Sequence, residues 1–186
     1  PGRLSRQAGC RQDRATMSSI QIGEISIAFE RQGKGPPLVL LHGGVSDSRE
    51  WRRQLHELSD AFTVVAWDAP GCGRSSDPPA HFLIADYADC LAGFIDALGL
   101  DHPHVAGLSF GGTLALELYR RHPDLPRTLV LASAYTGWAG SLPPEEVSRR
   151  LDGVIRDSKL PGHALAKRWL PTLLTDHAPA DCVEEL

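Results

Sequence analysis

The chain has 186 residues, of which 42% are hydrophobic and 23% are charged, and its formal net charge is −4. These proportions are typical of one globular domain with a sizeable core. The negative charge gives no electrostatic reason to expect binding to nucleic acid or to an anionic membrane. No apolar run is long enough to span a bilayer. From the charge and the lack of such a run together, we expect neither nucleic acid nor a membrane among the partners.

Residues 1–16 differ in composition from the rest of the chain. They carry four arginines and lack the apolar core that a secretory signal needs. Met17, the only methionine, stands directly before the first strand-like run. We therefore interpret residues 1–16 as a non-native or disordered leader and Met17 as the natural start. An arginine-rich transit peptide is the alternative.

The cysteines indicate neither a metal site nor a disulfide framework. They are Cys10, Cys72, Cys90 and Cys182. They are widely spaced, form no CxxC pair and do not cluster with histidines. The simplest interpretation is reduced thiols in a cytoplasmic protein.

Strand-like and helix-like segments alternate along the first 135 residues. Short apolar runs predict strands at 20–33 (a hairpin around Gly23), 36–44, 61–71, 102–109 and 127–133. Apolar residues at helical spacing predict helices at 48–60, 84–98 and 110–122. The apolar face of the second of these helices consists of Ile84, Tyr87, Leu91, Phe94, Ile95 and Leu98. This order predicts an α/β fold whose mostly parallel sheet has helices on both faces.

The character of the chain changes after Ser133. Two prolines followed by two glutamates predict the start of a helix over 143–157. The apolar face of that helix consists of Val147, Leu151, Val154 and Ile155. A further helix is expected at 163–174, and no strand follows it. We therefore divide the chain into a core at 17–136 and a helical segment at 137–186.

Residues 107–111, Gly-Leu-Ser-Phe-Gly, fit the pattern G-x-S-x-G. In this motif a sharp strand-to-helix turn holds the serine in a strained conformation and exposes its hydroxyl. The predicted strand before Ser109 and the predicted helix after it supply the context that the motif requires. We therefore predict that Ser109 is a nucleophile. The alternative is a small residue in a tight structural turn.

A second turn is a candidate for stabilising the negative charge that forms when the serine attacks a carbonyl group. His42-Gly43-Gly44 follows a buried strand, and such a turn can offer a backbone N–H. The N–H groups of Gly44 and Phe110 would together form an oxyanion hole. We expect His42 to be a buried structural histidine, and Asp68 to be a turn residue of the glycine-rich loop at 68–75.

These motifs together resemble the α/β-hydrolase superfamily over about residues 20–135. The motifs that support this resemblance are the "HGG" turn with Trp51 after it, the loop "DAPGCGRSSD", the turn "GLSFGG" and the segment "HPDLPRTLVLAS". The resemblance implies a Ser–His–acid mechanism without a metal or an organic cofactor. It also implies that residues 137–186 begin a helical cap. A serine nucleophile, in place of aspartate, argues against haloalkane dehalogenase and epoxide hydrolase chemistry.

In this fold the acid and then the histidine base follow the nucleophile along the chain. The candidates after Ser109 are His122, His163 and His177, and none is well placed by the predicted elements. We therefore expect the acid and the base to lie beyond Leu186, as in an N-terminal fragment of a longer hydrolase. We would then expect weak or absent catalysis by this chain. We would also expect an unpaired apolar edge at the last predicted strand, about 128–133.

The sequence thus predicts hydrolysis of an ester or a similar acyl bond in a small or medium apolar substrate. Tyr135 and Trp138, at the junction with the cap, are candidates for lining the acyl pocket, with plain packing as the alternative. The alternatives for the whole protein are a non-catalytic ligand-binding homologue and an inactive truncated product. The sequence predicts no oligomeric state.

Overall fold

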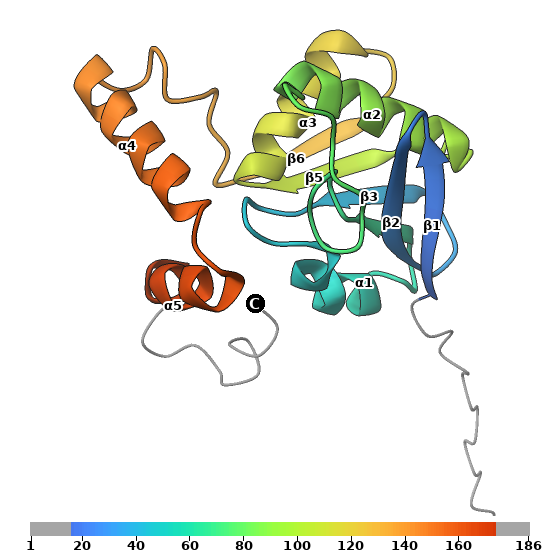
Figure 1. Ribbon diagram of the computed structural model, residues 1–186. Helices are drawn as coiled ribbons and strands as arrows, with labels where there is room; N and C mark the ends of the chain where they lie inside the picture. Colours follow the sequence, from blue (N-terminus) through green and yellow to red (C-terminus); the bar gives the residue numbers. More distant parts are fainter. Residues whose placement is uncertain (1–15, 174–186) are drawn as a thin grey trace, which may run out of the picture.

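The computed structural model describes residues 16–173 (Figure 1). Its sheet has six strands in the order β1-β2-β4-β3-β5-β6. The strands are β1 (Thr16–Ile22), β2 (Ile25–Gln32), β3 (Pro37–Leu41), β4 (Thr63–Trp67), β5 (His104–Leu108) and β6 (Thr128–Ala132). β1, β2 and β4 pair antiparallel, whereas β4, β3, β5 and β6 run parallel. The predicted α/β fold with a mostly parallel sheet is confirmed.

The predicted N-terminal hairpin is confirmed. Gly23, with φ at +57°, lies in the turn between β1 and β2, where a left-handed backbone suits glycine. β1 begins at Thr16, one residue before the expected boundary of the leader. The rest of the expected leader, residues 1–15, lies outside the described residues.

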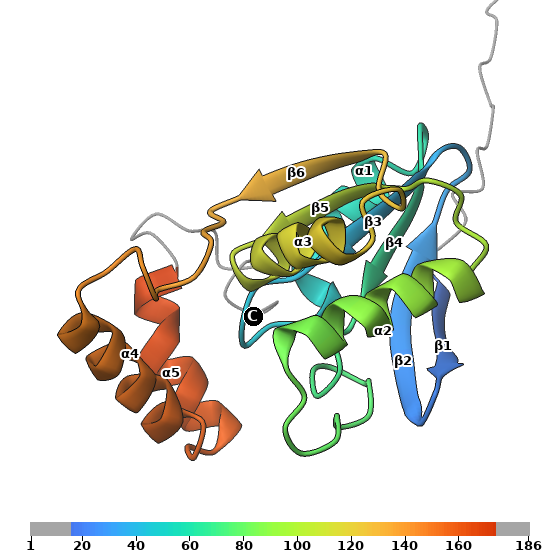
Figure 2. The same cartoon turned by 90° about the horizontal axis from the view of Figure 1, so that it is seen from above.

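The two faces of the sheet carry separate apolar layers, because successive strand residues point to opposite sides. On one face, Val39 and Val65 pack in the layer that includes α2 (Ile84–Ala97) and α3 (Phe110–Arg121). On the other face, Leu40 and Val64 pack with Leu55. Leu55 comes from α1 (Arg52–Glu57), which follows the short 3-10 helix η1 (Ser48–Trp51). Figure 2 shows α2 and α3 together on one side of the sheet.

Helix α2 follows the predicted apolar pattern except at its first residue. Leu91, Phe94 and Ile95 are fully buried, but Ile84 is 37% exposed. Ile84 is the first residue of α2 and follows the exposed Leu83. At this end of the helix it stays exposed, although the apolar spacing predicts that it is buried. Gly99 has φ at +63° and follows Leu98, the C-cap residue of α2, as expected for a glycine that ends a helix.

Strand β6 forms an exposed edge of the sheet. Within residues 16–173 it pairs only with β5. The side chains of Val130 and Leu131 are 58% and 42% exposed. Within residues 16–173 this edge is unpaired and apolar as predicted, and the aggregation hazard that it implies stays a prediction.

Two helices follow the sheet, α4 (Pro144–Asp157) and α5 (Gly162–Leu173), close to the predicted ranges. The buried Asp157 joins them, because its Oδ2 accepts bonds from Arg168 Nε at 2.9 Å and Trp169 Nε1 at 3.1 Å. The predicted apolar face of α4 is largely uncovered, with Val154 43% and Ile155 55% exposed. Among the described helices, none has the length and apolar character needed to cross a bilayer.

Candidate active site

Ser109 lies at the sharp turn between β5 and α3, and it has φ at 50° and ψ at −107°. Its N–H donates to the Ala132 carbonyl at 2.9 Å, and its carbonyl accepts the Thr113 N–H at 3.0 Å. A left-handed backbone at a non-glycine residue costs about 1–3 kcal/mol and persists only where its surroundings enforce it. Within the described chain the Ser109 hydroxyl has no hydrogen-bond partner, and its role as a nucleophile stays a prediction.

The glycines of the G-x-S-x-G turn are fixed by close backbone contact. A Cβ at Gly107 would overlap the carbonyl oxygen of Gly111. A Cβ at Gly111 would overlap the Leu41 carbonyl oxygen and lie 2.7 Å from that of His42. Only glycine lets β5, α3 and the end of β3 approach so closely. The motif therefore sets the distance between the serine turn and the strand that leads into the HGG turn.

The HGG turn lies beside the serine turn. A Cβ at Gly44 would lie 3.9 Å from the Cβ of Phe110, which is ordinary van der Waals contact. Neither the Gly44 N–H nor the Phe110 N–H donates to a protein group within residues 16–173. The two predicted oxyanion donors thus lie on adjoining turns with their N–H groups unused. Their role stays a prediction.

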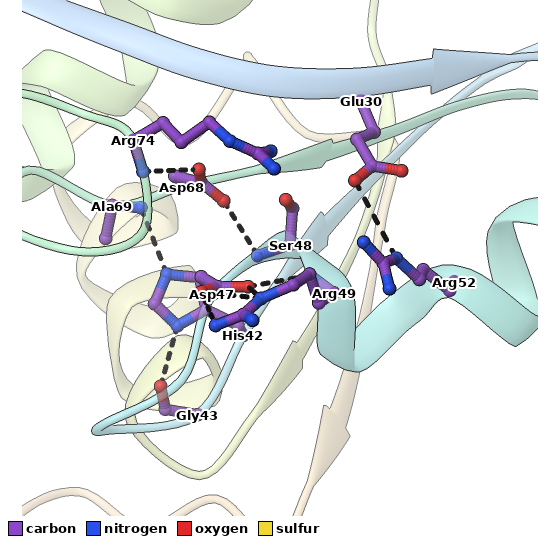
Figure 3. A network of polar contacts seen from close by, with 10 residues as sticks. All are labelled: Glu30, His42, Gly43, Asp47, Ser48, Arg49, Arg52, Asp68, Ala69 and Arg74. Atoms are coloured by element: carbon purple, nitrogen blue, oxygen red, sulfur yellow. Dashed lines mark hydrogen bonds and ion pairs between the residues drawn. The ribbon is translucent and has the colours of Figure 1, made fainter. Parts of the chain in front are cut away.

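His42 is a structural residue, as the sequence indicated. It is 1% exposed, and its Nε2 accepts the Ala69 N–H at 3.0 Å. Its Nδ1 lies 2.7 Å from the Gly43 carbonyl oxygen, so Nδ1 must carry the proton and donate (Figure 3). Because both ring nitrogens are engaged, His42 is not free to act as a base.

Asp68 organises the glycine-rich loop, again as expected. Its carboxylate accepts the Ser48 N–H at 2.8 Å and the Arg74 N–H at 2.9 Å (Figure 3). The Asp68 carbonyl accepts the Ser75 hydroxyl. Burial, followed by the charges of Asp68 and Asp47, raises the pKa of the Cys72 thiol to about 11. Cys72 is therefore protonated at neutral pH and is a poor nucleophile.

The segment after β6 passes beside the first turn of α3, because the Tyr135 carbonyl accepts the Thr113 hydroxyl at 3.0 Å. A hollow of about 210 Å³ lies between the loops after β3 and β4, and its lining is Val45, Ser46, Asp47, Arg49, Gly71, Cys72 and Gly73. Tyr135 is 41% exposed. The Trp138 ring packs under the Arg150 guanidinium, with 5.7 Å between the guanidinium carbon and the ring centroid. Substrate contact by Tyr135 and Trp138 stays a prediction.

The histidines after Ser109 in the described chain are not placed as its base. His122 follows the last residue of α3, a 12-residue helix, so it lies about 18 Å along the axis from the serine turn. Its Nε2 is 2.8 Å from Asp89 Oδ1. Arg121 and His122 lower the pKa of Asp89 to about 2, with Arg121 the larger influence. His163, in α5, is exposed, and His177 lies outside the described residues.

Glu50 is the site residue that sequence reasoning missed. Its Oε2 accepts the Gly43 N–H at 2.7 Å, which ties η1 to the HGG turn. Burial raises the pKa of this carboxyl group above its ordinary value. A single acidic residue in a short 3-10 helix gives no periodic signal, so only the three-dimensional contact identifies it.

The strained turn predicts that Ser109→Gly raises stability while removing the hydroxyl. We expect its free energy of unfolding to exceed that of Ser109→Ala by about 1 kcal/mol, because glycine relieves the strain at positive φ and alanine does not. Urea unfolding of the two variants and the native chain measures the difference. Equal stability of the glycine and alanine variants would show that the turn is not strained.

The strand order, the serine turn and the HGG turn together define an α/β hydrolase. The family model described as "alpha/beta hydrolase fold" matches residues 36–159, about two thirds of the chain. The chain therefore belongs to the α/β-hydrolase fold family.

Several relatives carry the names of hydrolases. The chain is 34% identical over 111 residues to 2-(acetamidomethylene)succinate hydrolase of Mesorhizobium japonicum, covering 60% of this chain and 40% of the relative. It is 39% identical over 119 residues to 2-hydroxy-6-oxo-2,4-heptadienoate hydrolase of Pseudomonas putida, covering 62% and 43%. A crystal structure of a hydrolase from Pseudomonas aeruginosa PA01 aligns with a TM-score of 0.77 at 26% identity, covering 92% of this chain and 65% of that one. The chain spans less than half the length of the two curated relatives.

Proposed function

We propose that the protein is a serine hydrolase that cleaves an ester or a similar acyl bond in a small or medium apolar substrate. The observation that carries this proposal is the backbone of Ser109, held at positive φ between β5 and α3 beside the HGG turn. A strained strand-to-helix turn is how this fold presents a nucleophilic hydroxyl. The names of the relatives, hydrolases of small molecules, support the same class of reaction.

The reaction would begin with attack of Ser109 Oγ on the substrate carbonyl carbon, while the hydroxyl proton passes to a base. The carbonyl oxygen then becomes an oxyanion that accepts hydrogen bonds from the Gly44 and Phe110 N–H groups. The positive end of α3 favours the same charge. Collapse of the intermediate expels the alcohol with the proton from the base. Water then cleaves the acyl-serine, which releases the carboxylic acid and restores Ser109.

Turnover of a nitrophenyl ester distinguishes hydrolysis from ligand binding alone. We would assay the 186-residue chain and a form extended at its C-terminus, because no described residue is assigned as the base. Ester cleavage that saturates with substrate supports the proposal. Binding of the ester without release of nitrophenol in both forms would contradict it and would favour a non-catalytic ligand-binding protein.

A further inference from the structure

The backbone of the HGG turn is held by a carboxylate from the next helical segment. The Gly43 N–H donates to Glu50 Oε2 at 2.7 Å. A Cβ at Gly43 would lie 3.6 Å from Glu50 Oε1 and 3.7 Å from Oε2, so both oxygens lie against the turn. Gly43 is buried and Glu50 is half-buried. A hydrogen bond to a carboxylate that is shielded from water is stronger than one between neutral groups.

The following peptide is held from the other side by His42. Its Nδ1–H donates to the Gly43 carbonyl oxygen at 2.7 Å. A trans peptide directs its carbonyl and the next N–H in opposite directions. Holding the Gly43 carbonyl therefore also fixes the direction of the Gly44 N–H. Two successive peptides of the turn are thus each anchored by one side chain, Glu50 for the first and His42 for the second.

We propose that Glu50 is a positioning residue that keeps the Gly44 peptide beside the turn formed by Ser109 and Phe110. This inference rests on the proposed function, in which the Gly44 N–H is an oxyanion donor. Catalytic donors act through their fixed placement before the charge develops. Glu50 would therefore assist the reaction without touching the substrate, by preventing rotation of the HGG backbone.

The burial of Glu50 and the groups around it give this role a dependence on pH. Burial raises the pKa of Glu50, and the nearby Asp47 raises it further, while the Gly43 N–H and His42 act in the opposite direction. The ionised carboxylate is the stronger acceptor. As pH falls through the raised pKa, protonation weakens the bond to Gly43. The amide proton of Gly43 should therefore report this titration directly.

The first test follows the Gly43 and Gly44 amide resonances of the 186-residue chain by NMR. In the native chain we expect the Gly43 amide shift to titrate with a midpoint above the ordinary value of 4.5. Glu50→Gln keeps an acceptor oxygen but cannot ionise, so this titration should disappear. In Glu50→Ala, both glycine amides should move at neutral pH. A Gly43 amide that does not titrate, or glycine shifts unaltered in Glu50→Ala, would overturn the proposal.

The second test measures the rate at which a fluorophosphonate labels Ser109 in the same chain and in the C-terminally extended form. We expect Glu50→Ala to lower the rate about tenfold, less than the 10²–10³ that complete loss of one oxyanion donor costs. Glu50→Gln should label at a rate between those of the native chain and Glu50→Ala at neutral pH, because its neutral oxygen is a weaker acceptor than the carboxylate. Glu57→Ala is the matched control, because Glu57 is an exposed acidic residue of α1 paired with Arg53.

The two tests separate this inference from the proposed function. Native labelling of Ser109 in Glu50→Ala would overturn the positioning role and leave the serine hydrolase intact. If no form labels Ser109 while the Gly43 amide titrates only when Glu50 is present, the proposed function fails. In that case the NMR result alone establishes that Glu50 holds the turn.

Discussion

Ser109→Ala is expected to abolish turnover of acyl substrates, with a loss of about 10⁴-fold or more. The alanine variant keeps the Cβ and the strained backbone, and it keeps the N–H groups of Gly44 and Phe110. It lacks only the hydroxyl that forms the acyl-enzyme. The measurement is kcat/KM for a nitrophenyl ester, made in whichever form of the chain is active.

Ser141→Ala is the matched control for this loss. Ser141 is exposed, and its N–H donates to the Trp138 carbonyl at 3.1 Å, a backbone bond that alanine keeps. Its turnover should equal that of the native protein. Turnover that survives in Ser109→Ala would place the nucleophile elsewhere and would reject the interpretation of the G-x-S-x-G turn.

Gly111→Ala is expected to have the largest effect on stability. Its Cβ would overlap the Leu41 carbonyl oxygen and lie 2.7 Å from the His42 carbonyl oxygen. Both obstacles are backbone atoms, so no flexible side chain can move aside. The end of β3 and the HGG turn would have to shift. We expect a loss of about 3 kcal/mol or more in the free energy of unfolding, measured with urea.

Gly153→Ala in α4 is the control for a glycine that lies in a helix without such contact. A Cβ there would meet only Arg156 Nη2, at 3.8 Å. Alanine is favoured over glycine in a helix by about 1 kcal/mol, so no loss of stability is expected. If Gly111→Ala were as stable as Gly153→Ala, the close approach of α3 to β3 would be refuted.

The sequence predicts the serine turn well because the physical cause of that turn is local. Gly107 and Gly111 are needed where backbones meet, and the apolar run and the amphipathic helix on either side identify the strand and α3. The same holds for the hairpin at Gly23 and the end of α2 at Gly99, because the positive φ at both positions favours glycine.

The rest of the site depends on contacts that no regular spacing in the sequence indicates. Glu50 meets Gly43 because η1 folds back over the HGG turn, and nothing in the spacing shows this. Helical spacing correctly groups Val154 and Ile155 on α4, but it cannot tell whether another element covers them, and in the described chain both are exposed. For the same reason the sequence nominates Tyr135 and Trp138 as pocket residues but cannot show which groups their side chains contact.

The most direct test of the account is to find where a fluorophosphonate attaches. The reagent forms a bond between Ser Oγ and phosphorus and releases fluoride, and the adduct is located by digestion and mass spectrometry. We expect one adduct, on Ser109, in the 186-residue chain or its C-terminally extended form. An adduct on a different residue, or none in either form, would contradict the assignment of Ser109 as the nucleophile.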